Sequence, residues 1–437
     1  MSRRVVRRGG LALTAISVAL ALTQLAGAAP ALADPNPQPL PPATRFFTPT
    51  PSAGAVKQVG QLIAKRDLKD AALITKEIAT PQAVWFTDGT AAVVKQKVRT
   101  VVVESTLTRT VPTLVVYNVP GRDCSQYSSG GAGSDEAYRT WVDGLAAGLS
   151  SSQRVIVIVE PDGLANLPSD CPSAYPGQDV AALTAGRIAD IKYAGMTITK
   201  SDPQALVYLD AGHSAWHSVG DITTRLEQAG VADVQGFSLN VSNYQFTPNL
   251  EEYGSWVSDC LAYTTSVKAG DTGSCGDMYW SGGPANNWTG TALNPNGQWS
   301  PTATDSALNT AGIDSRYASI LGTATPTAHY VLDTSRNGRG PWAAPASAGY
   351  PDPQTWCNPP GAGLGARPQA APAQAAYPLL DAFLWVKTPG QSDGQCNRGI
   401  SGSTTDPEWG GIVDPAAGAW FPQQALQLAQ NAVPSLF

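Results

Sequence analysis

The 437-residue sequence predicts an α/β fold in which a parallel sheet closes into a barrel. First, seven short apolar runs rich in β-branched residues have the length and composition of buried strands. Second, several of these runs are separated by stretches with a 3.6-residue apolar period. Third, two of the runs are followed by acidic residues, and active sites of parallel α/β folds lie at that edge of the sheet. Right-handed crossovers between such strands would close a barrel.

The expected strands, in chain order, are 83–87, 113–119, 154–160, 205–210, 234–240, 328–333 and 380–386. Helical periodicity is clear in 137–149, 180–194 and 222–229. Between 247 and 311 the pattern breaks into Gly-, Asn-, Ser- and Trp-rich sequence with no clear strand. We expect a structureless insertion there, and so long a stretch inside a compact domain is usually functional or mobile.

The first 33 residues have the organisation of a secretory signal peptide. Four arginines precede an apolar run at 11–25, and Ala31-Leu32-Ala33 stands before Asp34. A basic segment, a short apolar segment and a small-residue cleavage site are typical of export, and Arg3-Arg4 suggests the Tat route beside the Sec route. A membrane anchor is less favoured, because the run is short for a span of about 20 residues.

The next segment, 34–51, is rich in proline and predicts an extended tail or linker. The remaining 52–437 contain no repeat and no second globular unit, and α/β barrels tolerate this length as one domain. Residues 1–33 carry four arginines and no acid, so the rest has 24 basic against 34 acidic residues. A net charge near −10 argues against nucleic acid or an anionic membrane as a partner.

Two acids stand directly after apolar runs. Asp123 ends Val-Val-Tyr-Asn-Val-Pro-Gly-Arg-Asp (115–123), and Asp162 follows Ile-Val-Ile-Val-Glu-Pro (156–161). The preceding proline fixes the backbone before Asp162. Structural alternatives are a helix N-cap for Asp162 and an ion pair of Asp123 with Arg122.

Both runs resemble the signatures of glycoside hydrolase family 6, and the likeness extends from about Thr80 to the C-terminus. The family contains secreted cellulases that cleave β-1,4-glucan with inversion, on a distorted seven-stranded β/α barrel. Inversion needs a protonated acid for the leaving oxygen and a second group that accepts a proton from water. The resemblance makes Asp162 the acid, with Asp123 raising its pKa. Asp393, in Lys-Thr-Pro-Gly-Gln-Ser-Asp-Gly (387–394), matches the candidate base, and Ser129 matches a serine in a water relay.

Three alternatives to these assignments remain. Asp393 precedes Gly394, and Asp-Gly pairs also favour tight turns. Glu160 could act as the nucleophile of a retaining enzyme. His213 and His217 are four residues apart, as in some metal sites, but the sequence has only one further histidine, so we expect no metal and no cofactor.

The resemblance also implies a glucan-binding set and an electrostatic support. Aspartate 210 would support the acid, and aromatic rings would stack on the flat faces of sugars. The implied substrate-binding residues are Trp85, Thr87, Tyr117, His213, Trp216, Asn240, Trp356, Lys387 and Gln391. Two positions depart from the family: Gln391 replaces a common glutamate, and Val219 stands where some cellobiohydrolases have a tryptophan.

Six cysteines in an exported chain indicate three disulfides, with 15 possible pairings from sequence alone. The family implies one bridge between Cys124 and Cys171 and makes Cys396 the expected partner of Cys357. Cys260 and Cys275 are then left for a local bridge.

We therefore expect a monomeric, inverting enzyme that acts on cellulose and cello-oligosaccharides. The 51 residues from Lys387 to the C-terminus, with a long excursion at 394–418, resemble the cellobiose-releasing exo enzymes, whose loops cover the cleft. An endo enzyme is the alternative. A binding protein without turnover would require the loss of a catalytic acid, and every matched acid is present.

Overall fold

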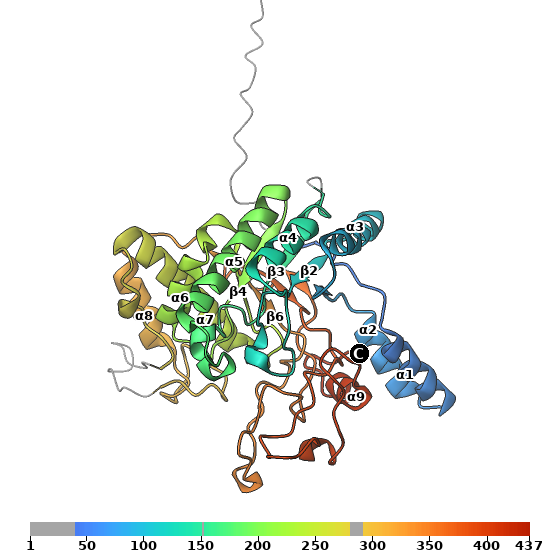
Figure 1. The fold of residues 1–437 in the computed structure, drawn as a ribbon. Coiled ribbons are helices and arrows are strands. Elements are labelled where there is room, and N and C mark those ends of the chain that lie inside the picture. Colours follow the sequence, from blue (N-terminus) through green and yellow to red (C-terminus); the bar gives the residue numbers. More distant parts are fainter. Residues whose placement is uncertain (1–39, 151–152, 280–291) are drawn as a thin grey trace, which may run out of the picture. The chain divides into compact units, whose positions relative to one another are not determined.

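The computed structural model describes residues 40–150, 153–279 and 292–437 (Figure 1). One sheet has the strand order β1-β2-β3-β4-β5-β6-β8-β7. The strands are β1 (Val84–Phe86), β2 (Thr113–Val116), β3 (Ile156–Val159), β4 (Leu206–Asp210), β5 (Gly236–Leu239), β6 (His329–Asp333), β7 (Gln369–Ala370) and β8 (Leu380–Leu384). All seven predicted strands are present and parallel, which confirms the fold class.

Two details differ from the expected seven-stranded closed barrel. The two-residue strand β7 adds an eighth strand, antiparallel to β8. The sheet is curled, yet no ladder joins β1 to β8 among the described residues. Their ends meet through a hydrogen bond from the Ala83 N–H to the Trp385 carbonyl oxygen, at 2.9 Å. The barrel is therefore distorted and incompletely closed.

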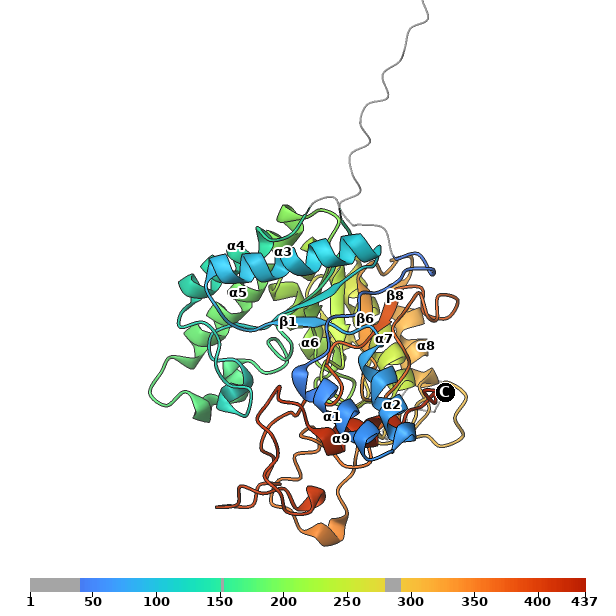
Figure 2. The same cartoon turned by 90° about the vertical axis from the view of Figure 1, so that its right-hand side faces the viewer.

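Helices cover the sheet and one end of it. They are α1 (Ala53–Ala64), α2 (Leu68–Ile78), α3 (Ala91–Thr108), α4 (Asp135–Ala146), α5 (Val180–Ser201), α6 (Val219–Gln228), α7 (Thr247–Ala262), α8 (Ala311–Leu321) and α9 (Pro422–Gln430). Figure 2 shows α3, α4 and α5 in a layer on the sheet, with α1, α2 and α9 grouped apart from them.

The continuous apolar runs follow from burial on both faces of each strand. All four residues of β3 are fully buried. Val157 and Val159 pack with Trp141 of α4 in the cluster under the helices. Ile156 and Ile158 belong to a second cluster, which contains the alternate residues of the neighbouring strands and fills the barrel interior.

The three predicted helices are present, with starts set by capping side chains. The hydroxyl of Ser134 accepts a hydrogen bond from the Ala137 N–H, so α4 begins two residues before the periodic pattern. The carboxylate of Asp179 caps α5 in the same way, through the Ala182 N–H. Such caps satisfy N–H groups that lack a partner within the first turn.

The expectation of a structureless stretch at 247–311 is wrong for its first part. Residues 247–262 form α7, and its buried side chains include Leu250, Tyr253, Val257 and Leu261. Their spacing of three or four residues is helical, and Pro248 suits the first turn. Residues 280–291 lie outside the described residues.

The signal peptide and the first part of the proline-rich segment also lie outside the described residues. Its last part packs on the barrel: Leu40, Phe46 and Phe47 are buried. The Phe47 N–H donates to the Val111 carbonyl at 3.0 Å, just before β2. Within the part of the chain that the structure describes, no helix has the length and apolarity needed to cross a membrane.

Candidate active site

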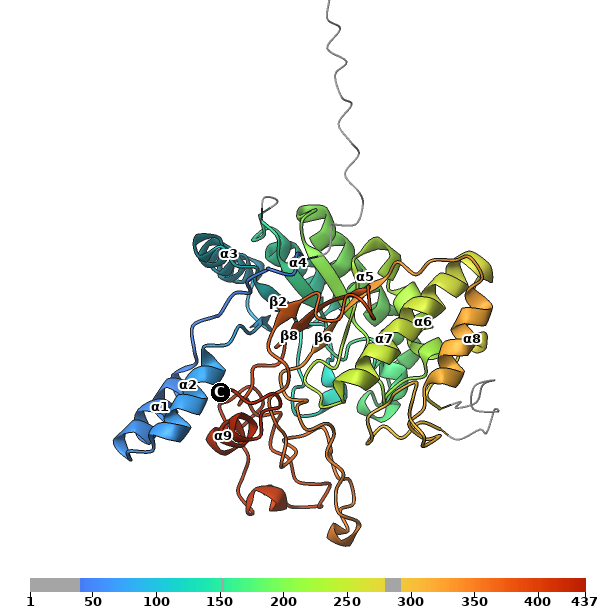
Figure 3. The same cartoon turned by 180° about the vertical axis from the view of Figure 1, so that it is seen from behind.

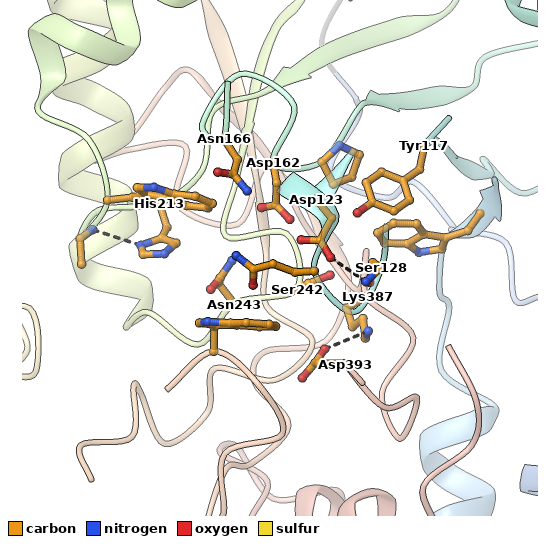
Figure 4. A pocket seen from close by; sticks show the side chains of 16 residues that line it. Tyr117, Asp123, Ser128, Asp162, Asn166, His213, Ser242, Asn243, Lys387 and Asp393 are labelled. Atoms are coloured by element: carbon orange, nitrogen blue, oxygen red, sulfur yellow. Dashed lines mark hydrogen bonds and ion pairs between the residues drawn. The ribbon is translucent and has the colours of Figure 1, made fainter. Parts of the chain in front are cut away.

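A cavity of about 370 Å³ opens at the carboxyl ends of the strands (Figure 4). Strand β1 and the connections after β2, β3, β4, β5, β6 and β8 contribute side chains to it. It is lined by Trp85, Tyr117, Asp123, Gln126, Ser128, Pro161, Asp162, Asn166, His213, Ala215, Trp216, Ser242, Asn243, Trp356, Lys387 and Asp393. The sheet edge that the sequence indicated therefore carries a cavity with three acids.

Asp162 points into this cavity close to Asp123 (Figure 4). No regular helix begins at Asp162, so it is not an N-cap; its backbone has a left-handed φ of 62° within a turn. Such a conformation is uncommon for residues other than glycine and often marks functional sites. Burial raises the pKa of Asp162 well above its usual value, and the negative charges of Asp210 and Asp123 raise it further.

Asp210 lies behind the acid, fully buried at the end of β4. Its Oδ1 accepts hydrogen bonds from the N–H groups of Asp162 and Gly212, at 2.9 and 3.2 Å, and its Oδ2 accepts one from the Ser238 hydroxyl at 3.0 Å. Burial raises the pKa of Asp210 to about 7, and these three hydrogen bonds oppose the shift. No described residue donates to the Asp162 carboxyl, so the proton of the pair resides on Asp162.

Asp123 has a similar backbone, with a φ of 60°. Its Oδ2 accepts a short hydrogen bond from the Ser128 N–H, at 2.6 Å. Burial raises the pKa of Asp123 to about 6, opposed by this bond and by the charge of Arg122. The guanidinium of Arg122 donates to the carbonyls of Ser128, Thr87 and Tyr117, so it shapes the loop instead of pairing with Asp123.

Glu160, the alternative nucleophile, is fully buried outside the cavity. Its carboxylate accepts hydrogen bonds from the N–H groups of Asn118 and Val119, at 3.0 to 3.1 Å. Burial raises its pKa to about 7, and these bonds oppose the shift. Glu160 therefore fixes the segment between β2 and Asp123, and its carboxylate does not face a bound substrate.

Asp393 lies on the other side of the cavity beside Lys387 (Figure 4). The NH1 of Arg336 donates to both carboxylate oxygens, at 3.0 and 2.9 Å, and the Nζ of Lys387 is 3.0 Å from Oδ1. Tyr244 and the Asn358 N–H donate to Oδ2, at 3.2 and 3.0 Å. Burial alone would raise the pKa of Asp393, but the two cations outweigh it and lower the pKa to about 2.

The sequence reasoning missed two fully buried partners of this region. Arg336 stacks on the Tyr244 ring at 4.4 Å and donates to the Ser242 carbonyl. Asp333, at the end of β6, accepts hydrogen bonds from the N–H groups of Ser242 and Lys387, both at 3.0 Å. An acid directly after an apolar strand, the signal that identified Asp162, would have identified Asp333 as well.

Aromatic side chains and His213 line the cavity around these acids. The Trp85 ring meets Tyr117 edge to face at 5.4 Å, and its Nε1 donates to the Val386 carbonyl. His213 lies 5.4 Å from Trp216 between ring centroids. Burial lowers the pKa of His213 to about 3, so the imidazole is neutral and can hydrogen-bond a hydroxyl.

Five predicted site residues lie outside this lining: Asp210, which lies behind Asp162, and four others. Ser129 is exposed, whereas its neighbour Ser128 lines the cavity. The Thr87 carbonyl accepts from Arg122. Asn240 is buried and its amide donates to the Asp333 carbonyl. Gln391 lines an adjacent cavity, which shares Trp85 with the first.

The three disulfides are those expected: Cys124–Cys171, Cys260–Cys275 and Cys357–Cys396. The first joins the loops that carry Asp123 and Asp162. Both ring nitrogens of His217 have partners, the Asp221 carboxylate at 2.7 Å and the Ala165 carbonyl at 2.6 Å. The sulfur of Cys396 lies within 4.8 Å of carboxylate oxygens of Asp406 and Asp414, but as a disulfide it offers no thiolate to a metal.

Comparisons with known proteins agree with this geometry. The family described as Glycosyl hydrolases family 6 matches residues 42–432. "Endoglucanase A" of Cellulomonas fimi is 34% identical over 364 residues, covering 83% of this chain and 57% of the relative. "1,4-beta-D-glucan cellobiohydrolase C" of Emericella nidulans is 28% identical, covering 74% of this chain and 61% of the relative. The chain thus spans less than two thirds of the length of these two relatives.

A solved structure supports the same family. It is the endoglucanase Cel6 from Mycobacterium tuberculosis in complex with methyl-cellobiosyl-4-deoxy-4-thio-β-D-cellobioside. The TM-score is 0.60 at 31% identity, with 89% of this chain and 97% of that chain covered.

Proposed function

The chain belongs to glycosyl hydrolase family 6, and from this premise we propose that it hydrolyses β-1,4-glucan with inversion at the anomeric carbon. One observation carries the proposal: Asp162, whose pKa is raised by burial and by two neighbouring acids, points into a cavity lined by aromatic rings. A proton held on a carboxyl near neutral pH is what cleavage of an acetal requires. The named relatives act as endoglucanase and cellobiohydrolase, which supports cellulose and cello-oligosaccharides as substrates.

In the proposed reaction, Asp162 gives its proton to the glycosidic oxygen as the bond between that oxygen and C1 breaks. A water oxygen forms the new bond to C1 from the opposite face of the sugar ring. When Asp123 and Asp210 are ionised, their negative charges beside Asp162 favour the protonated form of Asp162 until the leaving oxygen becomes basic.

Asp393 takes the second proton in this proposal. Its two cations keep it ionised at every working pH, so it is always ready to accept. A carboxylate with so low a pKa is a weak base, and its oxygens already accept hydrogen bonds from protein groups. Transfer through water is therefore favoured over direct contact, and the loop with Ser128 and Ser129 would carry that relay.

The rings position the glucan. Trp85, Trp216 and Trp356 offer flat apolar surfaces to sugar faces, while Tyr117 lies beside the two acids at the reacting ring (Figure 4). Neutral His213 and the ammonium of Lys387 are placed to bind hydroxyl groups. Thr87, Asn240 and Gln391 would contribute through the loops they support, since their side chains are outside the cavity lining.

We propose exo action that releases cellobiose, because loops meet at the edge of the cavity. The Tyr127 ring, in the loop of Asp123, lies 5.9 Å from that of Trp356, and the Tyr127 hydroxyl accepts a hydrogen bond from the Gln354 amide at 3.2 Å. Its hydroxyl also lies 3.5 Å from Asn397, at the start of the 394–418 excursion. Contacts of this kind close a groove and favour access from a chain end. Endo action is the second candidate, since two of the relatives above are named endoglucanases.

Export is part of the proposal. The leader at 1–33, the segment at 34–51 and three disulfides fit a protein that matures outside the cytoplasm as a monomeric catalytic domain.

The test is cellohexaose hydrolysis followed by proton NMR within the first minutes, with chromatography of the products. Inversion gives an α-anomeric reducing end first, and exo action gives cellobiose as the main early product. An initial β-anomer would mean a covalent intermediate and would overturn the mechanism. Mixed products, together with a rapid loss of carboxymethylcellulose viscosity, would establish the endo alternative.

A further inference from the structure

A buried polar network outside the cavity connects the 394–418 excursion to Asp393. Its members are Asn358, Arg398, Asp406 and Asp414, none of which is more than 1% exposed. Figure 3 shows the two connections that carry them, after β6 and after β8, next to each other in orange and red. None of the four lines the cavity, and the proposed chemistry uses none of them.

Asn358 brackets Asp393 from both sides. The Asn358 N–H donates to Oδ2 of Asp393 at 3.0 Å, and the Asn358 Oδ1 accepts from the Asp393 N–H at 2.8 Å. The backbone of Asn358 has a left-handed φ of 41°, which asparagine tolerates better than most residues. The orientation of the Asp393 carboxylate therefore depends on where Asn358 is held.

Asp414 in turn holds the side chain of Asn358. Its Oδ2 accepts from the Asn358 Nδ2 at 2.8 Å, and the same Nδ2 lies 3.0 Å from the Ser392 Oγ and from the Gly394 carbonyl. The other oxygen of Asp414, Oδ1, is buried and has no hydrogen-bond partner among the described residues. A buried oxygen in this position needs a proton of its own or a donor.

The charges around Asp414 determine whether its Oδ1 carries a proton or accepts a hydrogen bond from a donor. Both oxygens of Asp406 pair with the guanidinium of Arg398, through Nε at 2.9 Å and through NH2, so this pair is already neutral. An oxygen of Asp414 lies within 4.8 Å of one of Asp406. On the far side, Asn358 separates Asp414 from Asp393, whose charge is matched by Arg336 and Lys387. An ionised Asp414 would be a buried charge without a counterion of its own, which is strongly unfavourable.

We infer that Asp414 is a positioning residue for Asp393, acting through Asn358 as a neutral carboxyl whose proton is shared with Asp406. The shared proton also fastens the 394–418 excursion, since Asp406 and Asp414 both belong to it. The inference deepens the proposed function, because its catalytic consequence rests on Asp393 as the base. Its structural consequence, the fastening of the excursion, stands independently of the reaction.

The pKa values support this geometry. Burial raises the pKa of Asp414 to about 7, Asp406 adds to the shift, and the Asn358 hydrogen bond and Arg398 oppose it. The proton is therefore present in mildly acidic solution and lost above neutrality. Two adjacent carboxylates then repel, and the excursion loosens with Asn358.

The first experiment measures hydrogen exchange of peptides from 394–418 at about pH 5 and pH 9, after correction for intrinsic rates. The wild type should lose at least about fivefold in protection at the higher pH. In Asp414→Asn the amide donates to Asp406 and accepts from Asn358 at any pH, so protection should stay high at both. Asp414→Ala should be poorly protected at both.

Asp190→Asn is the matched control, because Asp190 on α5 is another fully buried carboxyl with an unpartnered oxygen and a pKa raised to about 6, chiefly by burial. In Asp190→Asn the protection of 394–418 should fall between about pH 5 and pH 9 as it does in the wild type. An excursion whose protection does not change with pH in the wild type, or an Asp414→Asn variant that loosens at pH 9 as the wild type does, would overturn the shared proton.

The positioning role is tested by Asn358→Ser on cellohexaose. The kcat should fall by about tenfold or more while KM changes by less than about twofold, because the substrate-binding surface is untouched. A KM effect with normal kcat would refute positioning. If the enzyme turned over no glucan at all, the proposed function would fail, while the exchange pattern of the Asp414 variants would still decide the proton bridge.

Discussion

Aspartates on the two sides of the cavity lie in opposite electrostatic environments. On one side the half-buried Asp162 and Asp123 lie close to the buried Asp210 with few compensating cations, and their pKa values are raised. On the other side Asp393 is buried but contacts two cations, and its pKa is lowered to about 2. The same side chain is therefore prepared to give a proton on one side and to remain ionised on the other.

The comparison shows that burial alone does not determine the state of an acid. Desolvation is the largest single effect on the pKa of all four residues, and in each it favours the neutral form. What differs is the neighbour. Like charges add to desolvation around Asp162, whereas Arg336 and Lys387 overcome it at Asp393.

The largest effect is expected from removing the proton donor. Asp162→Asn should lower kcat on cellohexaose by at least about 10³-fold, because an amide cannot protonate the leaving oxygen. The loss should be much smaller on a cellobiosyl fluoride, whose leaving group departs without protonation. Steady-state kinetics on both substrates gives the comparison, and Asp143→Asn, an exposed carboxylate on α4, is the control. Near-normal turnover of cellohexaose would remove Asp162 as the acid.

The second prediction tests the cationic side. Arg336→Gln should destabilise the protein by about 3–5 kcal/mol, because it leaves Asp393 buried with one cation fewer. Arg336 is the largest of the effects that lower the pKa of Asp393, so that pKa should rise as well. Urea unfolding near pH 6 measures the stability. Arg339→Gln, an exposed arginine three residues later, should cost little, and an equal loss in both variants would mean that the Asp393 pair is unimportant.

Much of the acidic side could be predicted from sequence, and the cationic side could not. Asp123 and Asp162 follow uninterrupted apolar strands, so the topology of a parallel sheet alone brings them to one edge. Arg336 lies in a loop after β6, and no local pattern shows that it returns to Asp393.

Motif matches located chain positions but not the directions of side chains. Asn240 and Gln391 stand where the family has sugar-binding residues, yet their side chains lie outside the cavity lining. Asn240 is in a left-handed conformation and donates to the carbonyl of Asp333, the last residue of β6. The register of a side chain in an irregular loop depends on long-range hydrogen bonds, which sequence spacing does not reveal.

Two fold errors have similar causes. The helix α7 was not predicted because Gly, Asn and Ser dominate the composition of 247–311. The apolar residues of the helix nevertheless keep a helical period. The strand β7 has only two residues and forms through pairing with β8, so no pattern precedes it.

The third prediction uses the sign of the pKa shifts. Asp123 has a folded pKa of about 6, above its unfolded value near 4. Its stabilising contribution is therefore complete below about pH 4 and is lost as the pH rises through about 6. The stability difference between wild type and Asp123→Asn should fall by up to about 3 kcal/mol across that window and then level off.

Thermal unfolding from about pH 2 to pH 8 measures this difference, with Asp88→Asn as an exposed control. Asp393 should give the opposite trend, with stabilisation present above about pH 4 and lost toward about pH 2. If the stability difference between wild type and Asp123→Asn rose with pH, neighbouring cations would outweigh burial at Asp123 as they do at Asp393.

The smallest effect concerns the loop contact that links the two sides. Tyr127, four residues after Asp123, contacts Trp356 with its ring and Gln354 with its hydroxyl, and it packs on Gly394 beside Asp393. Tyr127→Ala should leave the four acids in place, so turnover of short oligosaccharides should change by less than about threefold. If the contact closes the groove, the ratio of insoluble to soluble reducing ends that the variant produces on filter paper should rise by a factor of about two. Tyr127→Phe keeps the ring contact and loses only the two long hydroxyl contacts with Gln354 and Asn397, so it should keep the wild-type ratio. An unchanged ratio in a well-folded Tyr127→Ala would show that the two sides already face an open cleft, and endo action would then be the better proposal for this enzyme.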